Sequence, residues 1–201
     1  MRPALICQFA SAADRLLLES ALAGAPIDER LARCVEVAWQ LRQVDCARAS
    51  ALCAEARQLI STSRRDELAP RHTARLCLVE GEIALLHGNY DRARIGCDDA
   101  SAGFDACGDA VGSGDAAWLS ASILLELGRV AEFDQAMALA IEHYQRAGDL
   151  MRLKAAKARR WTLVAFVDAA AAARGMAEEL GDCDDCDDGA RAWIESAQAT
   201  I

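Results

Sequence analysis

The sequence contains little of what builds strands, rigid turns and membrane spans. β-Branched residues are sparse, and the 201 residues include only three prolines and 5% aromatic side chains. No segment alternates between apolar and polar residues for long enough to form a strand, and no apolar run approaches the roughly 20 residues that cross a bilayer. These absences exclude an all-β domain, a doubly wound α/β domain and a transmembrane helix.

Positive charge is also scarce, because 22 basic residues stand against 31 acidic ones and the net charge is −9. Affinity for nucleic acid rests on phosphate contacts, and anionic membranes attract basic segments, so this charge disfavours both as partners. The three histidines stand in no pattern with a nucleophile or a second base. We therefore expect a protein that is not an enzyme and that has no cofactor.

Alanine dominates the composition. About a fifth of the chain is alanine, with leucine next, and both residues favour helices. The nine cysteines are mostly single residues within helix-like sequence, which is typical of reduced core thiols in a cytoplasmic protein. The chain is long enough to bury a core without a disulfide or a metal. We therefore predict one all-α domain in the cytoplasm.

Turn signals divide the chain into segments of about 15–20 residues. Ser11, Asp28, Asp45 and Asp168 are suited to cap the helices that follow them, and Pro70 suits a first helical turn. The stretch 107–115 contains three glycines, and we interpret it as a flexible loop. The predicted helices cover about residues 11–23, 28–41, 45–60, 70–87, 90–106, 115–127, 130–147, 149–167, 168–181 and 190 onward.

The turns recur along the chain. The turn His87–Tyr90 has a counterpart 40 residues later at Leu127–Val130, and fainter copies lie near Asp45 and Asp168. Each unit is a pair of antiparallel helices joined by a tight turn. A single pair of this kind cannot bury its apolar face, so neighbouring pairs must stack into a continuous core.

The segment Cys77–Ala93 carries a small residue at Gly81, the turn sequence Gly-Asn-Tyr at 88–90, and alanines at 93 and 100. In these features it resembles the tetratricopeptide repeat family. The resemblance extends over about residues 28–180, with a repeat longer than the usual 34 or so residues, as in longer-repeat relatives from bacterial signalling regulators.

The resemblance implies a right-handed superhelix, or solenoid, of antiparallel helix pairs. We divide the chain accordingly into an N-terminal capping helix in 1–27, the repeats in 28–181, and an acidic loop with a C-terminal helix in 182–201. Exposed ends of such arrays favour self-association, and a homodimer is therefore one expectation.

Members of this family bind partners in a concave groove lined by the first helix of each pair. The resemblance therefore implies a peptide, a protein segment or a C-terminal domain of the same chain as the partner. Leu78 and Glu82 stand where the family's clamp for a peptide carboxylate needs lysine and asparagine, which argues against an acidic C-terminal tail. The residues expected to bind the partner are Leu78, Glu82, Trp118, Ser122, Lys154, Lys157 and Trp161.

Some of these residues carry a second interpretation. Trp39, Trp118 and Trp161 are expected either to pack between repeats or to anchor a partner, since tryptophan is common at binding hot spots. The basic stretch Arg152–Arg160 favours a solvated helix face, with an acidic partner as the alternative.

Two further hypotheses remain open. The runs Trp39-Gln40-Leu41-Arg42 and Ala158-Arg159-Arg160-Trp161 resemble the N-terminal region of bacterial diguanylate cyclases, although the GGDEF-type catalytic motif is absent from this chain. This favours a sensory region of a longer signalling protein. Cys183 and Cys186 form the one C-x-x-C, which suggests a metal or small-molecule sensor. Because zinc needs about four ligands and no second pair is present, we assign no metal site.

Overall fold

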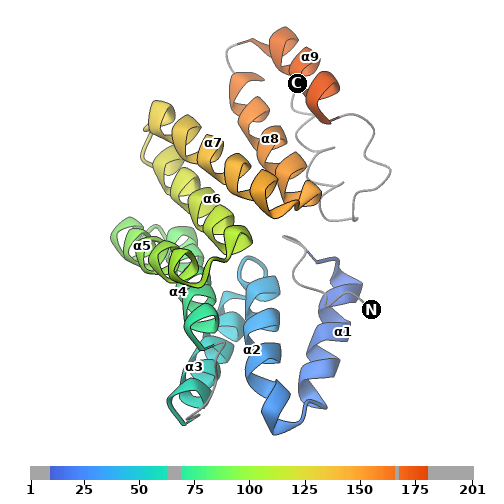
Figure 1. Ribbon diagram of the computed structural model, residues 1–201, viewed down its shortest axis with the longest axis vertical. Helices are drawn as coiled ribbons and strands as arrows, with labels where there is room; N and C mark the ends of the chain where they lie inside the picture. Colours follow the sequence, from blue (N-terminus) through green and yellow to red (C-terminus); the bar gives the residue numbers. More distant parts are fainter. Residues whose placement is uncertain (1–9, 63–68, 166–167, 181–201) are drawn as a thin grey trace.

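The computed structural model describes residues 10–62, 69–165 and 168–180, and within them every regular element is an α-helix (Figure 1). No strand occurs in these ranges, so the predicted all-α class is confirmed. The helices are α1 (Ala12–Ala23), α2 (Ile27–Leu41), α3 (Cys46–Thr62), α4 (Ala69–Leu86), α5 (Tyr90–Cys107), α6 (Ala110–Glu126), α7 (Val130–Ala147), α8 (Leu150–Ala165) and α9 (Ala169–Leu180). The helix predicted from residue 190 lies outside the described residues.

Side-chain caps fix several helix starts where the sequence predicted them. Ser11 and Asp14 form a capping box, in which the Ser11 hydroxyl accepts from the Asp14 amide at 3.1 Å. The Asp45 and Asp168 carboxylates accept from backbone amides three residues on, at 2.9 and 2.8 Å. Asp28 differs from its prediction, because α2 already begins at Ile27 and Asp28 lies in its first turn.

Four glycines with left-handed backbone follow α4, α5, α6 and α7 at intervals of 20 residues. They are Gly88, Gly108, Gly128 and Gly148, with φ between 66° and 71°. Only glycine adopts this conformation without strain, and it ends a helix by turning the chain sharply. The interval of 20 residues per helix gives 40 per pair, which is the period found in the sequence.

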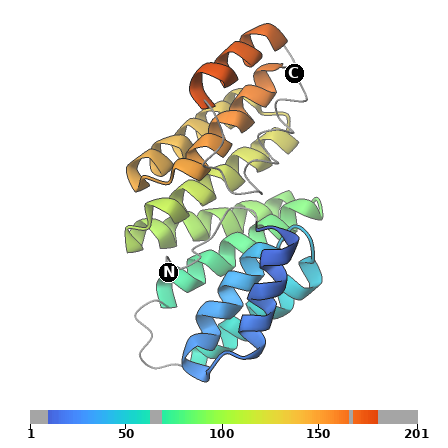
Figure 2. The same ribbon diagram turned by 90° about the vertical axis from the view of Figure 1, so that its right-hand side faces the viewer.

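Consecutive helices pack against one another along the molecule (Figures 1 and 2). We call α2, α4, α6 and α8 the first helices and α3, α5, α7 and α9 the second helices of four pairs. In addition to its neighbours in sequence, α4 contacts both α2 and α6. At least three of the first helices therefore form one layer, which is where the sequence analysis expected a binding face.

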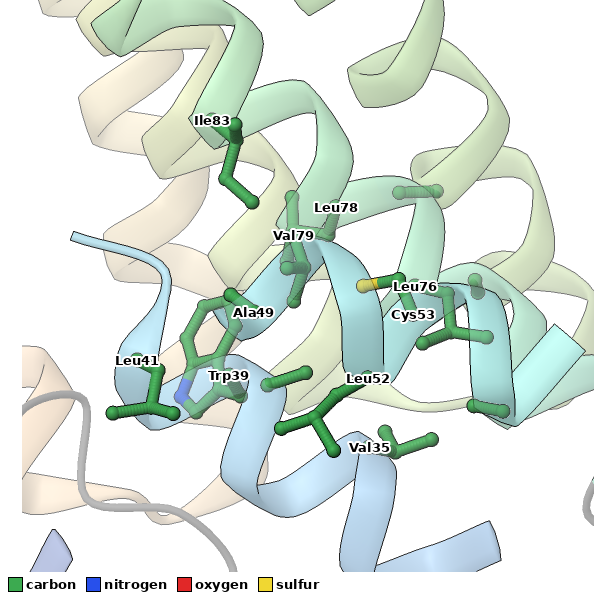
Figure 3. Close-up of a cluster of buried hydrophobic side chains, with 14 of the residues drawn as sticks. Val35, Trp39, Leu41, Ala49, Leu52, Cys53, Leu76, Leu78, Val79 and Ile83 are labelled. Carbon is green, nitrogen blue, oxygen red and sulfur yellow. The ribbon is translucent and has the colours of Figure 1, made fainter. Parts of the chain in front are cut away.

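The apolar core consists of two clusters that meet at α6. The first cluster runs from α1 to α6 and includes Trp39, Leu52 and Leu76, all less than 3% exposed (Figure 3). The second cluster joins α6, α7 and α8 around Phe133 and Met137. Helix α6 contributes Ala116, Leu119 and Ile123 to the first cluster and Ala117 and Ala121 to the second. Of the described helices, only α6 belongs to both clusters.

The predicted flexible loop at 107–115 is wrong, because α6 begins at Ala110 and includes Gly112 and Gly114. Both glycines are buried. A Cβ atom at Gly112 would overlap the ring of Phe104, and one at Gly114 would overlap the ring of Tyr144. The glycines therefore make room for aromatic rings from α5 and α7, and they do not form a flexible loop.

None of the described helices combines sufficient length with sufficient hydropathy to cross a bilayer.

Candidate functional site in the layer of first helices

A chain of buried charged and aromatic side chains runs through the first helices. We call it the buried polar strip and define it as Trp39, Arg42, Arg75, Asp115 and Arg152, each no more than 4% exposed. Trp39 belongs to α2, and Arg42 is the first residue after the end of that helix. Arg75, Asp115 and Arg152 lie on α4, α6 and α8, respectively. Charged groups are seldom so deeply buried unless each is paired, so the contacts of each decide what the strip does.

Asp115 is the centre of the strip. One carboxylate oxygen accepts a hydrogen bond from Arg75 Nη1 at 2.5 Å. The other oxygen accepts from Arg152 Nε and from the Tyr144 hydroxyl, each at 2.9 Å. These partners come from α4, α8 and α7, so one carboxylate on α6 connects four helices.

The charges around Asp115 keep it ionised. Burial alone acts to raise the pKa of Asp115, but Arg152 and Arg75, together with the hydrogen bonds from Arg75 and Tyr144, outweigh burial and lower it below its usual range. Burial and the Asp115 charge raise the pKa of Tyr144 well above its ordinary value. The Tyr144 hydroxyl therefore stays protonated and donates to an ionised carboxylate.

Arg152 has a second acidic partner. Its Nη1 atom donates to the Asp149 carboxylate at 2.8 Å, while its buried Nη2 atom has no hydrogen-bond partner. Arg152 was expected on a solvated helix face, but it is 3% exposed. That expectation is wrong for this residue, because α8 turns Arg152 toward Asp115 of α6.

At the other end of the strip, two guanidinium groups lie close to the Trp39 ring. Arg42 lies 3.5 Å and Arg75 4.6 Å from the ring centroid, distances at which cations bind aromatic faces. Arg42 Nε also donates to Glu82 of α4 at 2.6 Å. The Trp39-Gln40-Leu41-Arg42 run is therefore accounted for by packing between α2 and α4.

The predicted binding residues on α4 are engaged within the protein. Leu78 has no exposed surface and packs in the first apolar cluster, because α4 has neighbours on both sides. It therefore has no surface to offer a partner. The Glu82 side chain is 14% exposed and is bound by Arg42 and Gln43.

Trp118 and Ser122 are partly exposed on α6, one helical turn apart. The Ser122 hydroxyl donates to the Trp118 carbonyl at 3.1 Å, and the Trp118 ring packs against the second apolar cluster. Leu125 continues the same helix face and is also partly exposed. These three residues lie 40 positions after Leu78, Glu82 and Leu85, and of the three equivalent pairs only Leu78 and Trp118 differ in burial.

The three predicted binding residues on α8 differ in what they contact. Lys154 is partly exposed. Lys157 pairs with Glu179 of α9 at 3.5 Å. Trp161 packs over Gly175 of α9, where a Cβ atom would overlap its indole ring. Lys157 and Trp161 are therefore engaged with the second helix of their own pair.

Two cavities lie elsewhere in the described part of the chain. One of about 490 Å³ lies between the α4–α5 turn and the end of α6, where His87, Tyr90 and Leu127 contribute to its wall. Another of about 550 Å³ lies between α4 and α5 beside Cys77. Neither is lined by a predicted binding residue.

No three His, Cys, Asp or Glu side chains gather as a metal site would require within the described residues. Cys183 and Cys186 lie outside those residues. Comparisons with protein-family models, curated proteins and solved structures gave no significant match to this chain. The fold and the layer of first helices thus define an all-α protein compatible with a helical repeat.

Proposed function

We propose that the chain is a tetratricopeptide-like binding module, a right-handed superhelix whose first helices bind a peptide or protein segment. Three features support this architecture: the 20-residue interval between left-handed glycines, the layer of α2, α4 and α6, and the close crossing of α4 and α5. At that crossing Gly81 lies against the backbone of Ala93 and Cys97. Gly81 and Ala93 stand where the resemblance to the family expects small residues.

One observation carries the proposed binding face, namely the partial exposure of Trp118 on α6, one of the helices of the layer. Successive turns of α6 present a surface of mixed apolar and polar side chains, formed by Trp118, Ser122 and Leu125. Burial of an aromatic side chain at the centre of an interface commonly supplies much of the binding energy. A partner segment lying along α6 would bury Trp118, and the partly exposed Lys154 of α8 is the second contact that we propose.

The test is selection of phage-displayed peptides on the immobilised full chain. Selected peptides are then titrated against Trp118→Ala and against the control Ile95→Ala, since Ile95 is 55% exposed on α5, a second helix. We expect affinity to fall about tenfold or more in Trp118→Ala and to stay unchanged in the control. Equal affinity for both variants, or peptides no more enriched than on bare support, would refute the binding face.

Thermal melting of Trp118→Ala and of a further variant, Trp118→Phe, distinguishes an effect on binding from an effect on folding. Trp118→Phe keeps an aromatic ring against the second cluster, so it should retain the wild-type melting temperature and part of the affinity. A melting temperature that collapses in Trp118→Ala and also in Trp118→Phe would place Trp118 in the core and remove it from the binding face.

The alternative, a sensory region of a longer signalling protein, drew in part on two short runs. The buried stack of Trp39 and Arg42 gives the first run a packing role, and Trp161 of the second run packs on α9. These residues therefore carry no separate argument for signalling. The division of the chain at 27 and 181, the cytoplasmic location and the homodimer stay predictions.

A further inference from the structure

Three successive helix pairs each supply one member of the Asp115 cluster. Arg75 comes from α4 in the second pair, Asp115 from α6 in the third, and Arg152 from α8 in the fourth. Tyr144 adds a bond from α7. The side chains of Arg75, Asp115 and Arg152 are at most 5% exposed, so solvent does not screen their charges.

The apolar contacts alone connect the two ends of the described molecule through a single helix. Among the described helices, the two apolar clusters share only α6. Because repeat arrays are stabilised by contacts between neighbouring units, the interface terms decide whether the units unfold together or one at a time. Asp115 bonds directly to both sides of this junction, to α4 of the first cluster and to α7 and α8 of the second.

We propose that Asp115 is a coupling residue that makes the second, third and fourth helix pairs open as one cooperative unit. Each of its two oxygens is bonded to a guanidinium group, one to Arg75 of α4 and the other to Arg152 of α8. Displacement of α8 or α4 would break a buried ion pair at Asp115, which is costly. The fourth pair is thereby tied to the second across the third.

The experiment is hydrogen exchange of the full chain, measured by mass spectrometry, for wild type and Asp115→Asn. Asparagine keeps the shape of the side chain but removes the charge that holds both guanidinium groups. We expect amides of α8 and α9 to exchange about tenfold faster or more in the variant, while amides of α2 and α3 change by less than about twofold. Faster exchange by one common factor in all helices, or no change in α8 and α9, would overturn the proposal.

Asp134→Asn is the matched control. Asp134 of α7 pairs with Arg160 of α8 at 2.5 Å, but both side chains are more than 40% exposed. The substitution is the same and also breaks a bond to α8, yet an exposed pair contributes little. Exchange in α8 and α9 should change by less than about twofold in this control.

Arg152→Met provides a second decisive variant if Asp115→Asn does not fold. It leaves Asp115 bonded to Arg75 and Tyr144 and removes the link to the fourth pair, together with the bond from Arg152 to Asp149. We expect faster exchange confined to α8 and α9. An unchanged pattern, or an equal loss of protection in α2 to α5, would contradict the coupling role of Asp115.

Discussion

A carboxylate removed from water is stable only if its oxygens are bonded and its charge is compensated. Asp115 meets both conditions, because its two oxygens accept three hydrogen bonds and two of the donors are guanidinium groups. Neutralising one member of such a group leaves the others uncompensated. At the scale of single residues, a substitution of Asp115 is therefore expected to be strongly destabilising.

The first prediction concerns acid. The pKa of Asp115 is lowered in the folded protein, so its contribution to the free energy of unfolding is complete above the unfolded pKa of about 3.9. That contribution is lost as pH falls through the folded value. We expect wild type to exceed Asp115→Asn by about 3–5 kcal/mol at neutral pH, with the difference shrinking below about pH 4.

Urea unfolding at a series of pH values between neutral and about pH 3 measures this difference. A gap between the two proteins that stays constant down to about pH 3 would show that the Asp115 charge does not contribute to stability in this way.

The second prediction concerns thiol reactivity. Burial is the main cause that raises the pKa of Cys34 to about 11 and the pKa of Cys53 and Cys97 to about 12. Cys107 is exposed at the end of α5. Because the thiolate is the nucleophile, iodoacetamide at about pH 8 should alkylate Cys107 while the three buried thiols stay unmodified until urea unfolds the chain.

Peptide mass spectrometry of native and unfolded samples distinguishes the sites. Alkylation of Cys53 or Cys97 in the native protein as fast as Cys107 would mean that this part of the first cluster opens readily.

At the scale of helices, the close crossing of α4 and α5 depends on Gly96. A Cβ atom there would lie 2.8 Å from the Cys77 carbonyl oxygen and 2.9 Å from the Gly81 Cα atom. Backbone atoms cannot turn aside, so the helices must separate. We expect Gly96→Ala to cost about 1–3 kcal/mol, even though alanine favours the helix by about 1 kcal/mol.

Chemical denaturation measures that loss, and Gly24→Ala is its control. The nearest atom to a Cβ at Gly24 is 3.9 Å away, so this variant should match the wild type within about 0.5 kcal/mol. Equal stability of both variants would show that α4 and α5 tolerate a larger separation than their crossing indicates.

Most helix boundaries could be predicted because their determinants are local. Ser11, Asp45 and Asp168 cap helices through their own neighbours, and Val130–Ala147 is bounded by signals within a few residues. The start of α6 could not be predicted in the same way. Gly112 and Gly114 suggest a loop locally, and only the rings that pack on them explain their place inside a helix.

The binding residues could be predicted less well from the sequence than the fold could. Leu78 and Trp118 occupy equivalent positions 40 residues apart, yet Leu78 is fully buried and Trp118 is partly exposed. Burial depends on which helices lie alongside, and the repeat pattern does not specify this. The approach of Arg75 to Asp115 has no local signal, although a carboxylate among the small residues of α6 marked an unusual position.

At the scale of the whole molecule, the net charge of −9 produces self-repulsion that salt screens. The Arg75–Asp115–Arg152 cluster is buried and should be nearly insensitive to salt. We therefore expect sodium chloride, raised from about 0.02 to 0.3 M, to increase the melting temperature by a few degrees. A decrease of several degrees in a salt series would show that exposed ion pairs outweigh the repulsion.

The evenly spaced left-handed glycines have a consequence for how such a chain can grow. Gly88 and Gly128 end their helices with the same backbone geometry. A block of residues 89–128 is therefore preceded by one such turn and ends in another of the same kind. Duplicating that block would lengthen the protein by one helix pair without a new kind of junction. The copied block would bring a second Asp115 but no further arginine for it, so one carboxylate would keep only Arg75 and the other only Arg152. The backbone therefore allows growth by duplication, but each buried carboxylate would lose one of its two cations.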